Sequence, residues 1–139
     1  KAVFQEAMRL YPPAPVLTRE VREPFTLGGV PLPEKTVLYV PIHAVHRHEQ
    51  LWRDPARFDP DRFLGEEPRA RHRYAYLTFG AGPRICIGSA FATLEAVAIL
   101  AVLLPAARLQ PVTAQAPEPT LKITLRPKRP LLMRPAARA

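Results

Sequence analysis

The sequence contains a single cysteine, Cys86, among its 139 residues. One cysteine excludes an internal disulfide and any metal site built from several cysteines of this chain. Glycine is also scarce, with 6 residues against 18 prolines, so long uninterrupted helices are confined to the segments without proline. Apolar residues make up 47% of the chain, which is typical of a globular protein and argues against disorder.

Acidic residues are fewer than basic ones, with 12 Asp and Glu against 20 Lys and Arg and a formal net charge of +8. Such a chain favours an acidic partner, a nucleic acid or an anionic membrane. The basic residues are spread along the sequence and are not interleaved with aromatic residues as in single-strand binders. We therefore expect no nucleic-acid partner. The alternative, a basic nucleic-acid-binding domain, predicts salt-dependent DNA binding.

Two segments without proline predict helices. Residues 1–11 carry apolar side chains at helical spacing up to Pro12, and Ser89–Leu104 is apolar on nearly every side until Pro105, which we expect to end it. The second segment predicts a buried core helix, because it is shorter than the roughly 20 residues that span a bilayer and contains Glu95. No transmembrane segment is predicted in this chain.

Short apolar runs around turn residues predict strands. Residues 25–27 and 36–40 flank a Gly28-Gly29 turn, and residues 41–63 are expected to be irregular. Near the end, apolar residues alternate with polar ones over 121–126 and are expected to pair with residues 131–134. These patterns predict a mixed α and β chain.

Cys86 lies in a glycine-punctuated loop directly before the second predicted helix. The commonest fate of a free cysteine is that of a small apolar core residue. Three features favour a thiolate instead: the helix N-terminus that follows, Arg84 nearby, and glycines that let the backbone approach a bulky ligand. Such a thiolate serves either as a nucleophile, which needs a histidine base, or as a metal ligand.

Other candidate sites are weaker. His43, His46 and His48 form the only histidine cluster, but they lack the His-Glu-x-x-His order of zinc sites. The glycine loop lacks the third glycine and the Gly-Lys-Ser/Thr that phosphate-binding loops require.

The loop around Cys86 resembles the haem-ligand signature of the cytochrome P450 family, Phe-x-x-Gly-x-Arg-x-Cys-x-Gly. Its five fixed positions are Phe79, Gly82, Arg84, Cys86 and Gly88. Two further motifs stand in the family's order. Glu6-x-x-Arg9 resembles the K-helix motif, and Pro60-Asp61-Arg62-Phe63 resembles the meander motif.

The resemblance covers nearly the whole chain. It implies that residues 1–139 are a partial cytochrome P450 domain, comprising the K helix, the meander, the Cys-ligand loop, the L helix and a C-terminal hairpin. The implied fold is mixed, mainly α with short β hairpins. Because family members run to several hundred residues, the chain corresponds to about the C-terminal third of one, and both ends are expected to be cut. Lys35 departs from the family, which usually has glycine at that turn.

The resemblance implies haem as the cofactor and Cys86 as both the catalytic residue and the axial ligand of the iron. Phe79 is expected to pack near the sulfur, and Arg84 and Arg19 to bind the haem propionates. The implied cofactor-binding residues are Phe79, Gly82, Arg84, Cys86, Gly88 and Arg19.

Further residues carry structural or substrate-binding roles. Glu6 and Arg9 alone predict an exposed helix pair, whereas the resemblance implies a buried network with Arg62 that stabilises the fold. Val16 and Leu17 lie where the family contacts substrate, and plain core positions are the alternative.

The implied function of the intact protein is that of a monooxygenase that inserts one oxygen atom from O₂ into a small organic substrate. Electrons are expected to come from NAD(P)H through a redox partner, either a ferredoxin or a flavoprotein reductase. The expected location is cytoplasmic, with an upstream membrane anchor left open. The alternative function is a non-catalytic truncated fragment that cannot hold haem alone, and we expect residues 1–139 by themselves to be inactive.

Overall fold

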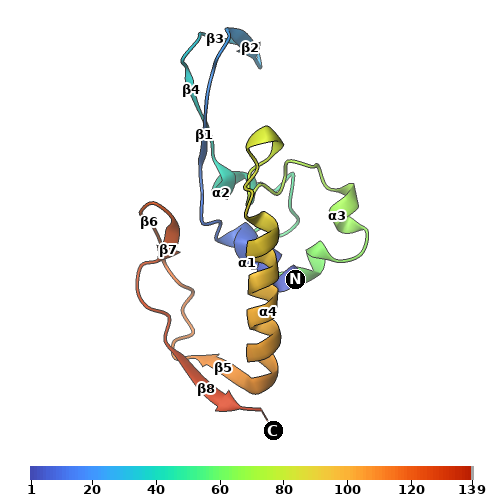
Figure 1. Ribbon diagram of the computed structural model, residues 1–139, viewed down its shortest axis with the longest axis vertical. Helices are drawn as coiled ribbons and strands as arrows, with labels where there is room; N and C mark the ends of the chain where they lie inside the picture. Colours follow the sequence, from blue (N-terminus) through green and yellow to red (C-terminus); the bar gives the residue numbers. More distant parts are fainter. Residues whose placement is uncertain (139) are drawn as a thin grey trace.

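The computed structural model describes residues 1–138, and its longest helix, α4, runs along the long axis of the molecule (Figure 1). In the described residues the α-helices are α1 (Ala2–Leu10), α2 (Ile42–Val45), α3 (Glu67–Ala70) and α4 (Ser89–Ala106). Two 3-10 turns are η1 (Pro60–Phe63) and η2 (Gly82–Arg84). About 30% of the chain is helical and 22% is in strands, so this stretch does not show the mainly α character that we expected.

The strands form antiparallel pairs, four of them within residues 1–138. Strand β1 (Leu17–Glu20) pairs with β4 (Val37–Val40), and β2 (Phe25–Leu27) with β3 (Val30–Leu32). Toward the other end of the molecule, β5 (Ala107–Pro111) pairs with β8 (Met133–Ala137), and β6 (Pro119–Leu121) with β7 (Leu125–Pro127) (Figure 1).

Two expected pairings are wrong. The Gly28-Gly29 turn, with both φ angles positive, joins residues 25–27 to β3 rather than to residues 36–40, which pair with β1. Similarly, β7 turns back onto β6, and residues 133–137 pair with β5 instead. In both cases the nearest turn closes a short hairpin, and the remaining strand pairs with a segment outside the predicted hairpin.

Helix α1 forms as its sequence predicts and ends before Pro12. One face buries Glu6, Arg9 and Leu10. The apolar residues of the buried core are few, namely Leu10, Val21, Ile42, Trp52 and Ala75. Within residues 1–138, buried polar or charged residues are as numerous as these non-proline apolar ones, namely Glu6, Arg9, His46, Arg62 and Thr78. Hydrogen bonds to buried polar groups therefore contribute much of the contact between α1 and the residues around it.

Helix α4 differs from expectation in two respects. It continues through Pro105 to Ala106, because a proline in the last turn removes a single N–H, and the Ala107 N–H still donates to the Leu103 carbonyl. The expected burial is also not observed, since no α4 residue is buried against the described part of the chain. Among residues 1–138, α4 is the one helix long and apolar enough to cross a membrane, a test that core helices of soluble proteins also pass.

Candidate functional site

Cys86 is exposed and lies on a loop that is held closed by backbone hydrogen bonds within the loop. The Cys86 N–H donates to the Phe79 carbonyl at 2.9 Å, and the Ile85 N–H donates to the Gly82 carbonyl at 3.1 Å. Gly80 and Gly82 have φ angles of +75° and +74°, which residues with a Cβ rarely adopt. These turns bring Cys86 back beside Phe79 and present the thiol at the surface.

The loop leads directly into α4. The Ser89 N–H donates to the Cys86 carbonyl at 3.3 Å, and Gly88 is the N-cap residue of the helix. A Cβ at Gly88 would lie 3.8 Å from Cys86 Sγ, an ordinary contact distance. The sulfur is therefore close to the N-terminal end of an 18-residue helix, where the helix dipole favours negative charge.

A cavity of about 340 Å³ opens beside Cys86. Its walls come from α1 and the turn that follows, from β1, and from the Cys86 loop. The lining residues are Met8, Pro13, Ala14, Leu17, Arg19, Thr78, Phe79, Gly80, Arg84 and Cys86. The structure thus brings Leu17, Arg19, Phe79, Arg84 and Cys86 to one cavity, although their roles toward a ligand stay predictions.

Arg19 and Arg84 supply positive charge to this cavity. Both are exposed, and Arg19 Nη1 donates to the Thr18 carbonyl at 2.8 Å. Within residues 1–138 neither guanidinium pairs with a carboxylate. Both are therefore available to an external carboxylate, which arginine binds in bidentate geometry.

These residues fit haem. Haem is a flat, apolar group that carries two carboxylates and an iron that binds sulfur. The cavity offers a complementary partner for each part: an apolar lining, two unpaired guanidinium groups and one thiol. Three other predicted residues do not line the cavity. Gly82 and Gly88 shape the backbone on either side of Cys86, and Val16 is 41% exposed on the neighbouring turn.

Glu6, Arg9 and Arg62 lie in contact and are fully or almost fully buried. Arg9 binds the Glu6 carboxylate through Nε at 2.7 Å and Nη2 at 2.8 Å, and Arg62 Nε donates to it at 3.1 Å. The Asp59 N–H adds a fourth bond at 2.9 Å. Burial alone would raise the pKa of Glu6, but these hydrogen bonds and the two arginine charges outweigh it and hold the pKa below its ordinary value.

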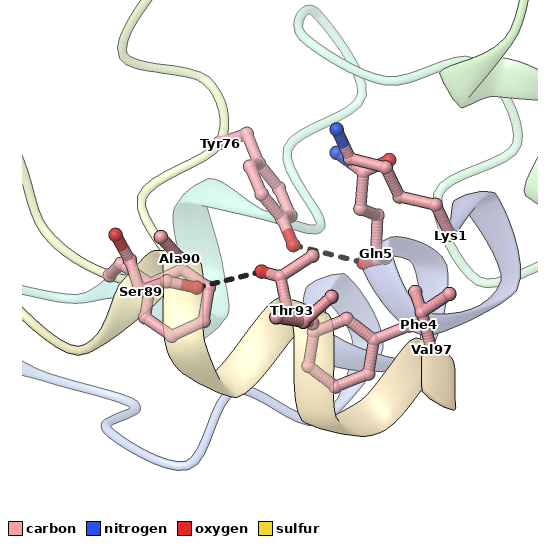
Figure 2. A pocket seen from close by; sticks show the side chains of 10 residues that line it. Lys1, Phe4, Gln5, Tyr76, Ser89, Ala90, Thr93 and Val97 are labelled. Atoms are coloured by element: carbon pink, nitrogen blue, oxygen red, sulfur yellow. Dashed lines mark hydrogen bonds between the residues drawn. The ribbon is translucent and has the colours of Figure 1, made fainter. Parts of the chain in front are cut away.

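A larger cavity, about 560 Å³, lies between α1 and the start of α4 (Figure 2). Figure 2 shows Phe4 of α1 and Thr93 and Val97 of α4 around it, with the Tyr76 hydroxyl donating to the Gln5 carbonyl at 3.2 Å. Phe79 lines both cavities. We assign the functional site to the smaller cavity, because it contains the thiol and the guanidinium groups.

His46 is a residue whose position the sequence analysis missed. It is fully buried, whereas His48 is exposed and His43 half-buried, so the three histidines do not act as one cluster. Among residues 1–138 no group of three or more His, Cys, Asp or Glu side chains is arranged to hold a metal ion. Local spacing in the sequence does not reveal the contacts of the His46 ring, because its two hydrogen-bond partners, Arg9 and Leu77, lie 37 and 31 residues away.

Comparisons with known proteins agree with the motif. The family model described as cytochrome P450 matches residues 1–134. The chain is 40% identical over 124 residues to a probable cytochrome P450 4aa1 of Drosophila melanogaster, covering 88% of this chain and 24% of that protein. It is also 40% identical over 129 residues to cyclooctatin synthase of Streptomyces melanosporofaciens, covering 91% and 28%.

A crystal structure of a cytochrome P450 (CYP102L1) superposes with a TM-score of 0.90 at 33% identity, covering 99% of this chain and 31% of that chain. The chain therefore spans about a quarter of the length of these curated relatives and about a third of that solved structure. Both the sequence and the fold lead to the same assignment: the chain belongs to the cytochrome P450 family.

Proposed function

We propose that this chain is the haem-binding C-terminal portion of a cytochrome P450 whose intact form is a haem-thiolate monooxygenase. The observation that carries this proposal is the cavity in which the Cys86 thiol meets Phe79, Arg19 and Arg84. Haem would supply the oxygen chemistry, and Cys86 would hold its iron through sulfur, a ligand whose electron donation favours O–O cleavage.

The residues of the chain bind and orient the cofactor. Cys86 presents its sulfur beside the N-terminal end of α4. Phe79, which lines the cavity beside Cys86, restricts the access of water to the sulfur. Arg19 and Arg84 approach from β1 and from the Cys86 loop and hold the two propionates. Leu17 contributes an apolar contact, and we propose that it faces the substrate.

The wider setting is also part of the proposal. The intact protein inserts one oxygen atom from O₂ into a small organic substrate, with electrons from NAD(P)H delivered by a ferredoxin or a flavoprotein reductase. We propose a cytoplasmic location and a mainly α fold for the intact protein, in which the short hairpins of this portion are the minority.

The absorbance of the reduced, CO-bound form tests the proposal. The complete protein is expressed with haem, reduced under CO, and scored for the band that is characteristic of thiolate ligation. We expect that band at one haem per chain. Failure to take up haem, or a CO spectrum without thiolate character, would overturn the assignment.

A non-catalytic fragment is the second candidate for residues 1–139 alone. It is favoured by α4, whose apolar side chains are not buried against the described part of the chain. The same spectrum recorded on residues 1–139 distinguishes the two, since the fragment is expected to show little or no thiolate band.

A further inference from the structure

The C-terminal end of α1 is tied to the rest of the molecule by its carbonyl groups. The last four carbonyls of a helix have no partner within the helix. Here each of them accepts a hydrogen bond. The Ala7 carbonyl accepts from the N–H of Tyr11, the C-cap residue of the helix itself. The other three bonds reach distant segments: Met8 with the Thr78 hydroxyl, Arg9 with His46 Nδ1, and Leu10 with the Arg47 guanidinium.

Of these partners, His46 uses both of its ring nitrogens, one toward α1 and one toward the segment that leads to Cys86. Its Nδ1 lies 3.1 Å from the Arg9 carbonyl oxygen, and its Nε2 lies 2.8 Å from the Leu77 backbone nitrogen. A carbonyl only accepts and an N–H only donates, so Nδ1 must carry the proton and Nε2 must accept. The two contacts together are compatible with a single neutral tautomer.

Leu77 begins the segment that enters the Cys86 loop. The Leu77 carbonyl accepts from the Gly80 N–H at 2.8 Å, and the Phe79 carbonyl accepts from the Cys86 N–H at 2.9 Å. Four hydrogen bonds therefore connect the end of α1 to Cys86, by way of His46 and the backbone of residues 77–80.

The ring of His46 is held against rotation by its neighbours. Tyr76 stacks on one face, with centroids 5.3 Å apart and planes at 12°, and Trp52 packs at 6.3 Å and 71°. Turning the ring would break both hydrogen bonds in a site with no exposed surface. A buried N–H or carbonyl without a partner is costly, so the arrangement has one stable state.

We propose that His46 is a positioning residue for the Cys86 loop: by accepting from the Leu77 N–H, it fixes the backbone entering the loop relative to α1 and so sets where the thiol meets the cofactor. This rests on the proposed haem-thiolate function. It assigns a site role to a residue that does not line the cavity.

Two substitutions separate the two hydrogen bonds of His46. In His46→Gln the amide oxygen reaches about the position of Nε2 and can still accept from Leu77. In His46→Asn the amide reaches only the position of Nδ1, so the bond to the Arg9 carbonyl remains and the Leu77 N–H loses its acceptor. Tyr76→Phe is the matched control, because it removes another bond between the same segment and α1 while retaining the stacked ring.

The experiment uses the complete haem-loaded protein, the three variants and two readouts. The first is the fraction of haem that gives the thiolate CO band, and the second is hydrogen exchange of the Leu77 amide. We expect His46→Gln and Tyr76→Phe to retain most of the band and Leu77 protection. His46→Asn is expected to lose most of the band and at least tenfold of the protection.

The outcomes distinguish this proposal from the proposed function. Faster Leu77 exchange in His46→Asn with an unchanged CO spectrum would overturn the positioning role. If the Leu77 amide exchanged equally fast in His46→Asn and His46→Gln, the hydrogen bond from Leu77 to the residue 46 side chain would not protect it, and the proposal would be overturned. Nitrogen NMR of the wild-type imidazole needs no variant: a proton on Nδ1 alone is expected, and any other tautomer contradicts the geometry. A wild-type protein without a thiolate band would instead refute the proposed function. Hydrogen exchange at Leu77 would still measure the hydrogen bond to His46, because it does not require haem.

Discussion

Arg9 and His46 hydrogen-bond to each other twice, across 37 residues of sequence. Arg9 Nη1 donates to the His46 carbonyl at 2.7 Å, and His46 Nδ1 donates to the Arg9 carbonyl at 3.1 Å. Arg9 also binds the Glu6 carboxylate. The pair therefore joins the buried ionic network to the residue that holds the entrance of the Cys86 loop, and damage to either is expected to affect the other.

Arg62→Ala should destabilise the protein strongly. It leaves the buried Glu6 carboxylate with one of its two arginines, and breaking a buried ion pair costs about 3–5 kcal/mol. The free energy of unfolding and the haem content of the complete protein are measured. Arg69→Ala is the matched control, because Arg69 pairs with Glu66 at the exposed surface and should change neither quantity. A soluble Arg62→Ala protein with full haem content and altered turnover only would show that the network serves catalysis.

The stability of the protein should fall between pH 6.5 and about 4 because of His46. Burial, together with the charges of Arg9 and Arg47 and the neighbouring His43, lowers the pKa of His46 to about 4, although the bond to the Arg9 carbonyl opposes this. In that window the unfolded chain binds a proton that the folded chain does not. Stability is therefore lost as the pH falls from 6.5 toward 4, by an amount on the order of 3 kcal/mol.

Unfolding free energies measured at several pH values test this, with His46→Gln as the control. The Gln variant should lose most of the slope above about pH 5.5, where Glu6 hardly contributes, and keep a smaller slope because burial and the charge of Arg47 also lower the pKa of His43. Below that value both proteins should lose stability, because the pKa of folded Glu6 lies below its ordinary value and protonation favours the unfolded chain. An unchanged slope in the variant would contradict the assignment to His46.

Local sequence patterns predicted the parts of the fold that depend on neighbours in the chain. Proline placement located the end of α1, an apolar run located most of α4, and the spacing of Glu6 and Arg9 placed them together. The Cys86 loop was found from its residues, because glycine, arginine and cysteine rarely fall at this fixed spacing by chance.

Contacts across long stretches of sequence could not be predicted in this way. The pairing of β1 with β4 depends on residues about 20 apart, and nothing in either strand specifies the other. The position of His46 depends on a helix end and on a loop entrance that meet only in the folded chain. The sequence places His46 among neighbouring histidines, whereas the actual partners of its ring are backbone atoms of Arg9 and Leu77.

Cys86→Ser should abolish the thiolate CO band of the complete protein. A serine hydroxyl is not a thiolate donor, and the electron donation that favours O–O cleavage would be lost. Cys86→His is the companion variant, since imidazole can hold haem without that donation, and it should bind haem with a CO spectrum of another type. If Cys86→Ser retained the thiolate band, Cys86 would not be the sulfur ligand of the haem.

Lys35→Gly should stabilise the hairpin that follows β1. Lys35 has a φ of 66°, in the left-handed region that costs residues with a Cβ about 1–2 kcal/mol. Its N–H donates to the Val21 carbonyl at 2.8 Å, a bond that glycine retains. After the extra chain entropy of glycine is subtracted, we expect a gain of about 0.5–1 kcal/mol in unfolding free energy. Glu34→Gly, at a neighbouring position without positive φ, should instead destabilise the protein.

Residues 1–139 expressed alone should aggregate, and α4 should be the cause. The side chains of Phe91, Leu94 and Val102 are 69%, 69% and 71% exposed, and together they form an apolar surface of the kind that soluble monomers rarely show. The net charge of +8 opposes association but does not cover this surface. Light scattering of the purified fragment measures the effect.

Substituting Leu94 and Val102 by lysine identifies the cause. The double variant should increase the soluble fraction of residues 1–139, because the apolar surface of α4 is interrupted. In the complete protein the same change should reduce folding and haem content, since we expect α4 to pack there against other segments. Arg69→Lys and Arg73→Lys together serve as a control that keeps the charge and leaves α4 intact. If the lysines on α4 are harmless in the complete protein, its apolar surface is not part of a core.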